Sequence, residues 1–577
     1  MKKEIMQAFA QRMSDAFIAG DYGEGNKLLA ELMDRQDVTS PQDDPNRGNF
    51  RFYAGDTDVS DRNGLPFAGI HLGFVVLEHA DHIEESLRKR LWGQTLPDCL
   101  IGYDGHYRAS GAGSSGEPMP RWWQCNIWFL TTAGRLMIAR ALGREDHIAI
   151  AREKLREVRR YIELYGIGEY NSPTYYGDQL HGLHWAWYYA PDDAFRGDAA
   201  ALLDEMYLDM AEHYHSGSGE LGGTWSRHYE QDIRGRRMFS RYAAAAFHGN
   251  EASYLQRFGL EDYRCPDEIG KIALEEKPYS VHRRNIIDVR RTMYQAPEYS
   301  LGTQSGRFVW YVSDVPLVLT YVAPGDRRVA IIGNPYWSKD VHPAVDYSVD
   351  FTSWAHQHEN AAILSYGHKR GGNDLLFNLA NVEEYVPTLV NEDGTPLAVP
   401  ECPMMPAPPD REPGRPDNPH RPGHSEDLSF AEPAEREPPG AEVDGPVIAE
   451  LPSCYLAAIP AADLTLRVAI MRGQMHIVIP VRPAALLAVV VAGKSAIGSL
   501  RSFVERMKDV RVDEVETPAV ARAARLRGWG PTLTAGREPD GRLFDRRVDD
   551  LPEEADEYLC HSMFYRRRSG ERLGMMK

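Results

Sequence analysis

Paired cysteines, long apolar runs and an excess of basic residues are all missing from this sequence. Its six cysteines are scattered with no CxxC pair, which fits neither a zinc framework nor a disulfide scaffold. The most apolar run, 483–493, is too short to span a bilayer, and the first residues contain no apolar segment of signal-peptide length. A net charge of −19 disfavours nucleic acid and anionic membranes as partners. We therefore expect a cytoplasmic protein that binds neither nucleic acid nor membrane, and the sequence leaves open whether it forms a homo-oligomer.

Short motifs of several enzyme classes are also absent. No GxGxxG occurs in a strand–turn–helix setting, and there is no Walker loop, HExxH or GxSxG. These absences argue against nucleotide-binding, zincin and α/β-hydrolase functions. His356 and His358 alternate onto one face of a predicted strand, as metal ligands can, but no third ligand is identifiable. We expect no cofactor, with a divalent metal at this histidine pair left open.

The first half of the chain has the hydrophobic periodicity of helices. Apolar helices alternate with amphipathic ones, which suggests an inner ring of helices inside an outer ring. A break is expected at Leu96-Pro97, and 101–120 is expected to be a glycine-rich functional loop. Helices are predicted at 3–18, 22–35, 69–93, 121–142, 146–164, 175–190, 195–214 and 234–248.

The second half is rich in short β-branched and aromatic runs separated by turn residues. Because helices precede strands, we expect an α+β multidomain protein, with a helical domain at 1–268 and an antiparallel β domain at 269–577. Within the latter, 403–446 holds 12 of the 38 prolines and is expected to be a disordered insertion. A helix is predicted at 498–508, and strands at 309–312, 317–322, 328–332, 454–458, 465–471 and 475–481.

Chemically versatile residues gather in the stretch 169–184. Ser172 and Pro173 predict a helix start, because serine caps orphan amides and proline has no amide to leave unpaired. The polar cluster is flanked by strongly apolar residues, which indicates the lining of a cleft. A capping amide and two core histidines are the plain alternatives. The candidate catalytic residues here are Asn171, in the loop before the helix, and His181 and His184, one turn apart on one face.

A second cluster follows two glycines at 222–232. An arginine beside a tyrosine lowers the cost of the phenolate, so Tyr229, near Arg227, could exchange a proton with a substrate. The alternative is that Arg227 pairs with Glu230 or Asp232.

Further aromatic and polar residues would bind a substrate in the cleft, although the tryptophans could instead fill a core. These candidates are Trp122, Trp123, Gln124, Asn126, Tyr175, Trp225, Tyr299, Gln304 and Arg307.

Helices followed by antiparallel strands, with Asn, His, Tyr and Arg in the helical half, resemble the heparinase, chondroitin/hyaluronan and alginate lyase-like polysaccharide lyases. The resemblance implies an (α/α) toroid followed by a β-sandwich, and β-elimination on a uronate-containing glycan. It also implies that Asn171 neutralises the uronate carboxylate and that Tyr229 acts as base and acid. His181 or His184 would be a base or second neutraliser, Arg227 would hold a carboxylate or tune Tyr229, and an oligo- or polysaccharide would be the partner.

Two other functions fit the same residues. A glycoside hydrolase on a helical toroid needs two carboxylates. A non-catalytic carbohydrate-binding protein would need only the aromatic residues. The carboxylates available for hydrolysis are Glu169, Asp178, Glu230 and Asp232.

Overall fold

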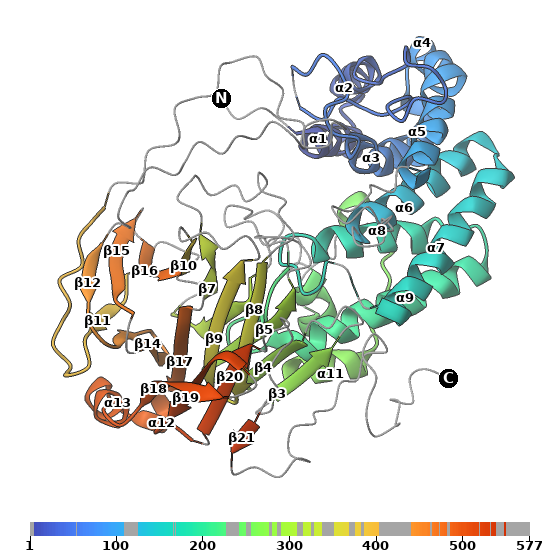
Figure 1. The fold of residues 1–577 in the computed structure, drawn as a ribbon. Coiled ribbons are helices and arrows are strands. Elements are labelled where there is room, and N and C mark those ends of the chain that lie inside the picture. Colours follow the sequence, from blue (N-terminus) through green and yellow to red (C-terminus); the bar gives the residue numbers. More distant parts are fainter. Residues whose placement is uncertain are drawn as a thin grey trace.

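The fold is seen in a computed structural model of the chain (Figure 1). The structure describes residues 5–53, 55–108, 125–165, 167, 169–226, 242–249, 255–275, 280–284, 290–307, 315–324, 328–336, 351–368, 375–381, 386–402, 440–461, 464–471, 474–481, 485–517, 520–530, 532–537 and 547–549.

Helices make up the amino-terminal half. Figure 1 shows α1–α9 gathered on one side of the molecule, away from most of the strands. Their bounds are α1 (Met6–Ile18), α2 (Tyr22–Asp34), α3 (Gly64–Glu78), α4 (Glu85–Arg90), α5 (Leu96–Arg108), α6 (Cys125–Leu142), α7 (Glu145–Tyr165), α8 (Tyr176–Tyr188), α9 (Asp193–His213) and α11 (Asp267–Leu274). Short 3-10 and π turns lie at Ala80–His82, Leu91–Thr95, Ala244–His248 and Leu255–Phe258. No helix in the described part of the chain has the length and apolarity needed to cross a bilayer.

The apolar helix α6 is the centre of the helical half. Its residues 125–139 are all buried, and it packs against α3, α7 and α8. The amphipathic α7 covers it with one apolar stripe and faces solvent with its charged side, as its periodicity predicts. The apolar helix α8 is similarly buried from Tyr176 to Ala186.

The predicted break at Leu96-Pro97 is wrong. The chain stays helical through a π turn at Leu91–Thr95 and continues directly into α5. Pro97 is the second residue of α5, and the π turn before it shifts the backbone hydrogen bonds at the place where proline offers no N–H. The predicted loop 101–120 is therefore helical as far as Arg108, and the rest of it lies outside the described residues.

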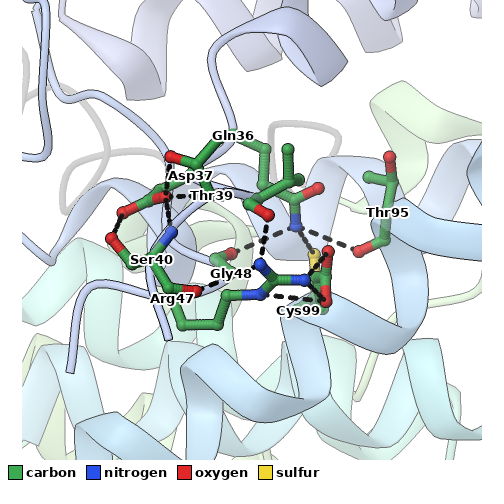
Figure 2. A network of polar contacts seen from close by, with 10 residues as sticks. Gln36, Asp37, Thr39, Ser40, Arg47, Gly48, Thr95 and Cys99 are labelled. Carbon is green, nitrogen blue, oxygen red and sulfur yellow. Dashed lines mark hydrogen bonds and ion pairs between the residues drawn. The ribbon is translucent and has the colours of Figure 1, made fainter. Parts of the chain in front are cut away.

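A polar network fixes the segment 36–48 against α5 (Figure 2). Arg47 Nη2 donates to both Asp98 oxygens, at 2.8 and 3.0 Å, and Arg47 Nη1 donates to the carbonyls of Val38 and Ser40. Gln36 Nε2 reaches across to the Thr95 carbonyl oxygen at 3.0 Å. These contacts bind a stretch that has no regular secondary structure to a buried helix.

The carboxyl-terminal half consists mainly of antiparallel strands. One sheet has the order β11-β13-β14-β17-β9-β8-β5-β6-β7-β10-β16-β15-β12, with β4 also paired to β5 and β3 paired to β4. A second sheet has the order β18-β19-β20-β21. The first sheet contains β3 (Ser280–Arg284), β4 (Arg290–Ala296), β5 (Tyr299–Arg307), β6 (Leu317–Val322), β7 (Arg328–Tyr336), β8 (Phe351–His358), β9 (Ala361–His368), β10 (Leu375–Asn381), β11 (Thr388–Val390), β12 (Ala441–Val443), β13 (Val447–Glu450), β14 (Cys454–Pro460), β15 (Leu466–Met471), β16 (Gln474–Val481) and β17 (Ala485–Gly493). The second contains β18 (Arg511–Thr517), β19 (Val520–Arg527), β20 (Thr532–Arg537) and β21 (Arg547–Asp549), and two short helices, α12 (Lys494–Ile497) and α13 (Leu500–Met507), precede it.

The prediction of an α+β protein with helices before antiparallel strands is confirmed. The finer (α/α) toroid and β-sandwich, and the boundary at 268/269, stay predictions. The end of the predicted disordered insertion 403–446 is ordered: it contains strand β12, whose residues pair with β15. Residues 403–439 lie outside the described residues. The apolar run 483–493 is largely strand β17, which is hydrogen-bonded on both sides by β14 and β9.

Candidate functional site

The candidate site lies where the helical half meets the sheet. After α9 the chain forms a two-stranded hairpin, β1 (Tyr214–His215) and β2 (Glu220–Leu221), and then runs along β5 and toward β6. The Val315 N–H donates to the Trp225 carbonyl oxygen at 2.7 Å. A Cβ placed on Gly302 of β5 would lie 2.4 Å from Gly223 Cα, so only glycine permits this close backbone approach. We call residues 222–226 the seam segment.

Asn171 binds the seam segment to the loop before α8. Its Nδ2 donates to the Gly222 carbonyl oxygen at 2.7 Å and to the Thr224 carbonyl oxygen at 3.0 Å. Ser226 completes the connection, since its N–H and Oγ both bind the Tyr170 carbonyl oxygen, at 3.1 and 2.7 Å. The segments 169–172 and 222–226 are therefore side by side, although Asn171 and Gly222 are 51 positions apart in the sequence.

The orientation of the Asn171 amide follows from these contacts. Carbonyl oxygens can only accept, so the atom facing them must be Nδ2, and both of its hydrogens are used. Oδ1 is buried and has no hydrogen-bond donor among the described residues. The backbone has φ of +48°, a left-handed conformation in which asparagine is favoured over most residues. Asn171 is fully buried, and its amide keeps one unused acceptor and no free donor.

A buried chain of hydrogen bonds starts at the neighbouring tyrosine. Tyr170 OH contacts His213 Nε2, and His213 Nδ1 lies 2.7 Å from the Asp209 carbonyl oxygen. That carbonyl can only accept, so Nδ1 carries a proton and, in the neutral ring, Nε2 accepts from Tyr170. The Asp209 carboxylate lies 3.8 Å from Nδ1 and also accepts from Tyr176 OH at 2.7 Å. This arrangement can take a proton from Tyr170 and stabilise the resulting imidazolium.

The sheet adds a cation to this cluster. The Arg291 guanidinium of β4 lies 4.1 Å from the centroid of the Tyr170 ring. Gln304, a predicted substrate-binding residue on β5, accepts from Arg291 Nε at 3.1 Å and so reaches the cluster through the arginine. Gln295 Nε2 donates to the His213 carbonyl oxygen at 3.2 Å. Both halves of the chain therefore contribute side chains.

The two histidines predicted to be catalytic lie deeper in the helical half. Trp185 Nε1 donates a hydrogen bond to His181 Nε2 at 2.9 Å. His184 Nε2 lies 2.8 Å from Tyr207 OH, and its Nδ1 lies 3.4 Å from Asp262 Oδ1. Burial lowers the pKa of His184, and the nearby Asp262 carboxylate opposes that shift. None of these contacts involves Asn171.

Ser172 and Glu169 make hydrogen bonds near the amino-terminal ends of α8 and α6, respectively. Ser172 Oγ accepts from the Tyr175 N–H at 3.1 Å. Ser172 thus caps a turn that lies just before Tyr176, the first residue of α8. The buried Glu169 carboxylate accepts from the Asn126 N–H at the start of α6, at 2.9 Å, and lies 3.3 Å from Gln179 Nε2. A carboxylate is stabilised at a helix amino terminus by the helix dipole. Asp178, the other described carboxylate of this stretch, accepts from Gln7 at 3.0 Å.

The remaining predicted residues are only partly placed. The Trp225 indole is buried and donates to the Leu221 carbonyl oxygen at 3.0 Å, and Tyr299 OH contacts the Val491 carbonyl oxygen within the core of the sheet. His356 is buried and His358 is half-buried on β8, and the described part of the chain contains no group of three or more His, Cys, Asp or Glu that could hold a metal ion. Outside the described residues lie Trp122, Trp123, Gln124, Arg227, Tyr229, Glu230, Asp232 and the side chain of Arg307.

Sequence reasoning missed four residues of the cluster. Tyr170 directly precedes Asn171, but a single tyrosine in a loop gives no sequence signal that separates it from the other tyrosines of this stretch. His213 and Asp209 have the four-residue helical spacing that aligns side chains, in a helix selected only for its apolar stripe. Arg291 gives no local signal, because only the packing of β4 against the helical half brings it to Tyr170.

Comparisons with known proteins give one partial family match and several similar structures. Residues 37–261 match a family model described as "Domain of unknown function (DUF8769)". No curated protein matches the sequence. The chain is similar to heparinase III, with 9% identity over 89% of this chain and 79% of that chain, at a TM-score of 0.41. It is also similar to the chondroitin AC lyase of Streptomyces coelicolor A3 (12% identity, 92% and 91% of the two chains, TM-score 0.32) and to the baculovirus envelope protein ODV-E66, a chondroitin lyase (9%, 93% and 88%, TM-score 0.22). These structures bear the names of the class that the sequence resembles.

Proposed function

We propose that this protein is a lyase that cleaves a uronate-containing oligo- or polysaccharide by β-elimination. The observation that carries the proposal is the meeting of the Asn171 amide with the Tyr170–His213 hydrogen bond and Arg291 at the boundary of the two halves. β-Elimination requires three things of an enzyme: a neutralised carboxyl group, a base for the adjacent C5 proton, and an acid for the departing oxygen. Amide, imidazole, phenol and guanidinium groups can together supply all three.

Asn171 would neutralise the carboxyl group by an uncommon route. Because both Nδ2 hydrogens bind carbonyls, the remaining Oδ1 can only accept a hydrogen bond. It would therefore bind the uronic acid in its protonated form, or share that proton with it. Withdrawal of charge from the carboxylate makes the C5 proton more acidic, which is the step that the enzyme must assist.

Tyr229 is proposed as base and acid, with Arg227 as the cation that stabilises its phenolate, on the sequence argument alone. His181 and His184 could still contribute, but their bonds to Trp185 and Tyr207 favour a role in the helical core. The proposed substrate-binding wall includes Asn126 and Tyr175, which lie at the starts of α6 and α8.

The hydrolase alternative depends on a free pair of carboxylates. Glu169 and Asp178 both bind elements of the helical half, through the α6 amino terminus and Gln7 respectively, so no observation favours a catalytic use of them. The products separate the possibilities. Elimination leaves a conjugated C4–C5 double bond that absorbs ultraviolet light, hydrolysis leaves none, and a binding protein forms no product.

The assignment of Tyr229 is tested by Tyr229→Phe, which removes only the hydroxyl group. We expect the variant to fold normally and to lose turnover of the uronate oligosaccharide that the parent protein cleaves. Tyr161→Phe is the matched control: this half-buried tyrosine of α7 donates its hydroxyl to Glu157, away from the candidate site, and the variant should retain turnover. Full turnover by Tyr229→Phe would exclude this tyrosine as base or acid.

A further inference from the structure

A pocket of about 460 Å³ lies at the end of α8 opposite the candidate site. The 13 residues of α8 span about 20 Å, so Tyr188 at one end is well separated from the Asn171 loop at the other. The pocket volume is within the range of small-molecule sites. Helices α3, α6, α8 and α9, the α8–α9 loop and the loop before α11 contribute its lining, which consists of Glu78, Arg140, Trp187, Tyr188, Tyr189, Ala190, Arg196 and Glu261.

One buried tyrosine fixes a carboxylate and a guanidinium on this lining. Tyr189 OH donates to Glu78 Oε1 at 2.9 Å, and its carbonyl oxygen accepts from Arg140 Nη1 at 2.8 Å. The ring is stacked on Trp185, at 5.8 Å between centroids, and is 4% exposed. Glu78 and Arg140 are therefore held in place before any ligand arrives, which reduces the ordering cost of binding.

The charged side chains of the pocket do not neutralise one another. Within the described part of the chain, none of Glu78, Glu261, Arg140 and Arg196 has an ion-pair partner within 4.0 Å. The Arg196 guanidinium instead lies 5.8 Å from the Trp187 ring centroid. Two carboxylates and two guanidinium groups thus surround aromatic rings without pairing, although unlike charges on a surface readily do so.

Two helix ends of opposite partial charge meet at the pocket. The pocket lies between the carboxyl terminus of α8, which carries partial negative charge, and the amino terminus of α9, which carries partial positive charge. Burial raises the pKa of Tyr188, and the Glu78 and Glu261 carboxylates raise it further. Arg196 belongs to the first turn of α9, at the positive end.

We propose that this pocket binds a small zwitterion of the amino-acid type. Its ammonium group would lie between Glu78 and Glu261 beside the Tyr188 ring, where carboxylates and an aromatic face both attract a cation. Its carboxylate would lie at Arg196 and Arg140, since guanidinium groups bind carboxylates through paired N–H donors. Its apolar part would contact Trp187. A neutral sugar could also use these groups as hydrogen-bond partners, but it would not neutralise their unpaired charges.

Calorimetric titration of the full-length protein with four probes tests the proposal. The probes are L-phenylalanine, N-acetyl-L-phenylalanine, L-phenylalaninamide and methyl α-D-glucopyranoside. We expect L-phenylalanine to bind, and loss of either charge to weaken binding at least about tenfold, which corresponds to about 1.4 kcal/mol. Three results would overturn the proposal. These are binding of the glucoside without binding of L-phenylalanine, equal affinity for L-phenylalanine and its two derivatives, and no binding of any probe.

Two variants connect binding to the pocket. Glu78→Gln and Arg196→Gln should each weaken L-phenylalanine binding about tenfold or more, while Glu85→Gln, an exposed carboxylate on α4, should leave it unchanged. All three variants should retain the unfolding midpoint of the parent protein and its glycan turnover, because the pocket lies at the far end of α8. Unchanged affinity in both pocket variants would place the ligand elsewhere.

Discussion

Asn171 combines a backbone conformation that few residues tolerate with an amide that binds two carbonyls of a distant segment. Beside it, Tyr170 and His213 form a hydrogen bond that is shielded from water. Buried polar groups of this kind cost free energy unless they are fully bonded. At the residue scale, the candidate site is therefore a set of groups held in costly positions by specific partners.

Replacing Asn171 separates its two properties. Asn171→Ala should lower the free energy of unfolding by about 2–4 kcal/mol, since two buried carbonyls lose their donor and a Cβ is kept at positive φ. Asn171→Gly also lacks the amide, but glycine tolerates the positive φ, so this variant should lose less unfolding free energy than Asn171→Ala. Both variants should reduce glycan turnover by about 100-fold or more, because both lack the amide. Urea titrations and initial rates measure the two effects, and a glycine variant with parental turnover would contradict the role of the amide.

His184 gives the protein a predictable response to pH. Burial makes its pKa lower in the folded state than the ordinary value of about 6.5, so the unfolded chain binds more protons in that range. Stability should therefore fall as the pH is lowered from 7.5 through 6.5, and the pKa values of His147 and His79 are lowered by burial in the same sense. His184→Gln should flatten part of this dependence. Urea unfolding across that pH range would show it, whereas an unaltered pH profile in the variant would mean that His184 does not contribute.

At the scale of elements, the seam segment depends on glycine where two backbones touch. Gly302→Ala would place a methyl group 2.4 Å from Gly223 Cα, so β5 and the seam segment would have to move apart. We expect a loss of about 1–3 kcal/mol in unfolding free energy, together with reduced turnover. Gly23→Ala, in α2, is the matched control, because its added methyl group meets nothing closer than 3.8 Å. If both variants behave alike, the close approach has no functional importance.

The network of Figure 2 is a second element-scale constraint. Arg47→Met should cost about 2–4 kcal/mol, because the largely buried Asp98 carboxylate loses its bidentate partner. The double variant Arg47→Met/Asp98→Leu should be less destabilised than the single one, since no charge is then left unpaired. The exposed pair Lys89–Glu85 is the control, and Lys89→Met should cost under about 1 kcal/mol. Guanidinium unfolding midpoints provide the comparison; equal losses in the two single variants would contradict the assigned importance of the network.

Periodicity predicted most helices and many strands because each has its own local pattern. The amphipathic α7 (Glu145–Tyr165) agrees with the predicted helix 146–164, and the apolar α6 ends at Leu142 as predicted. The predicted start of the latter helix, 121–124, lies outside the described residues. Local pattern failed at Pro97, where a π turn accommodates the proline, and at Ser172, which caps a turn before α8 rather than the helix itself. Both failures concern hydrogen-bond detail that composition does not encode.

At the scale of the whole molecule, the candidate site exists only because the two halves pack together. The sequence indicated that the 169–184 and 222–232 stretches share a site, and the described parts of both are bonded through Asn171 and Ser226. It could not indicate Arg291, since a residue 121 positions from Tyr170 is brought close only by tertiary packing (291 − 170 = 121). Long-range contacts of this kind leave no periodic trace in a single sequence.

The molecule as a whole is acidic, with a net charge of −19, so a polyanionic substrate gains no long-range attraction from it. Local cations such as Arg291 must then provide the attraction, over the short range that salt screening permits. For the proposed lyase function, this charge favours short uronate oligosaccharides, which carry fewer negative charges than polymers.

The most direct test of the account is to incubate the protein with a panel of uronate-containing oligosaccharides and to record ultraviolet absorbance and product mass together. β-Elimination by this protein should raise the absorbance through the C4–C5 double bond, with product masses that sum to that of the substrate. Products that sum to the substrate plus one water, with no change in absorbance, would contradict elimination and establish hydrolysis instead.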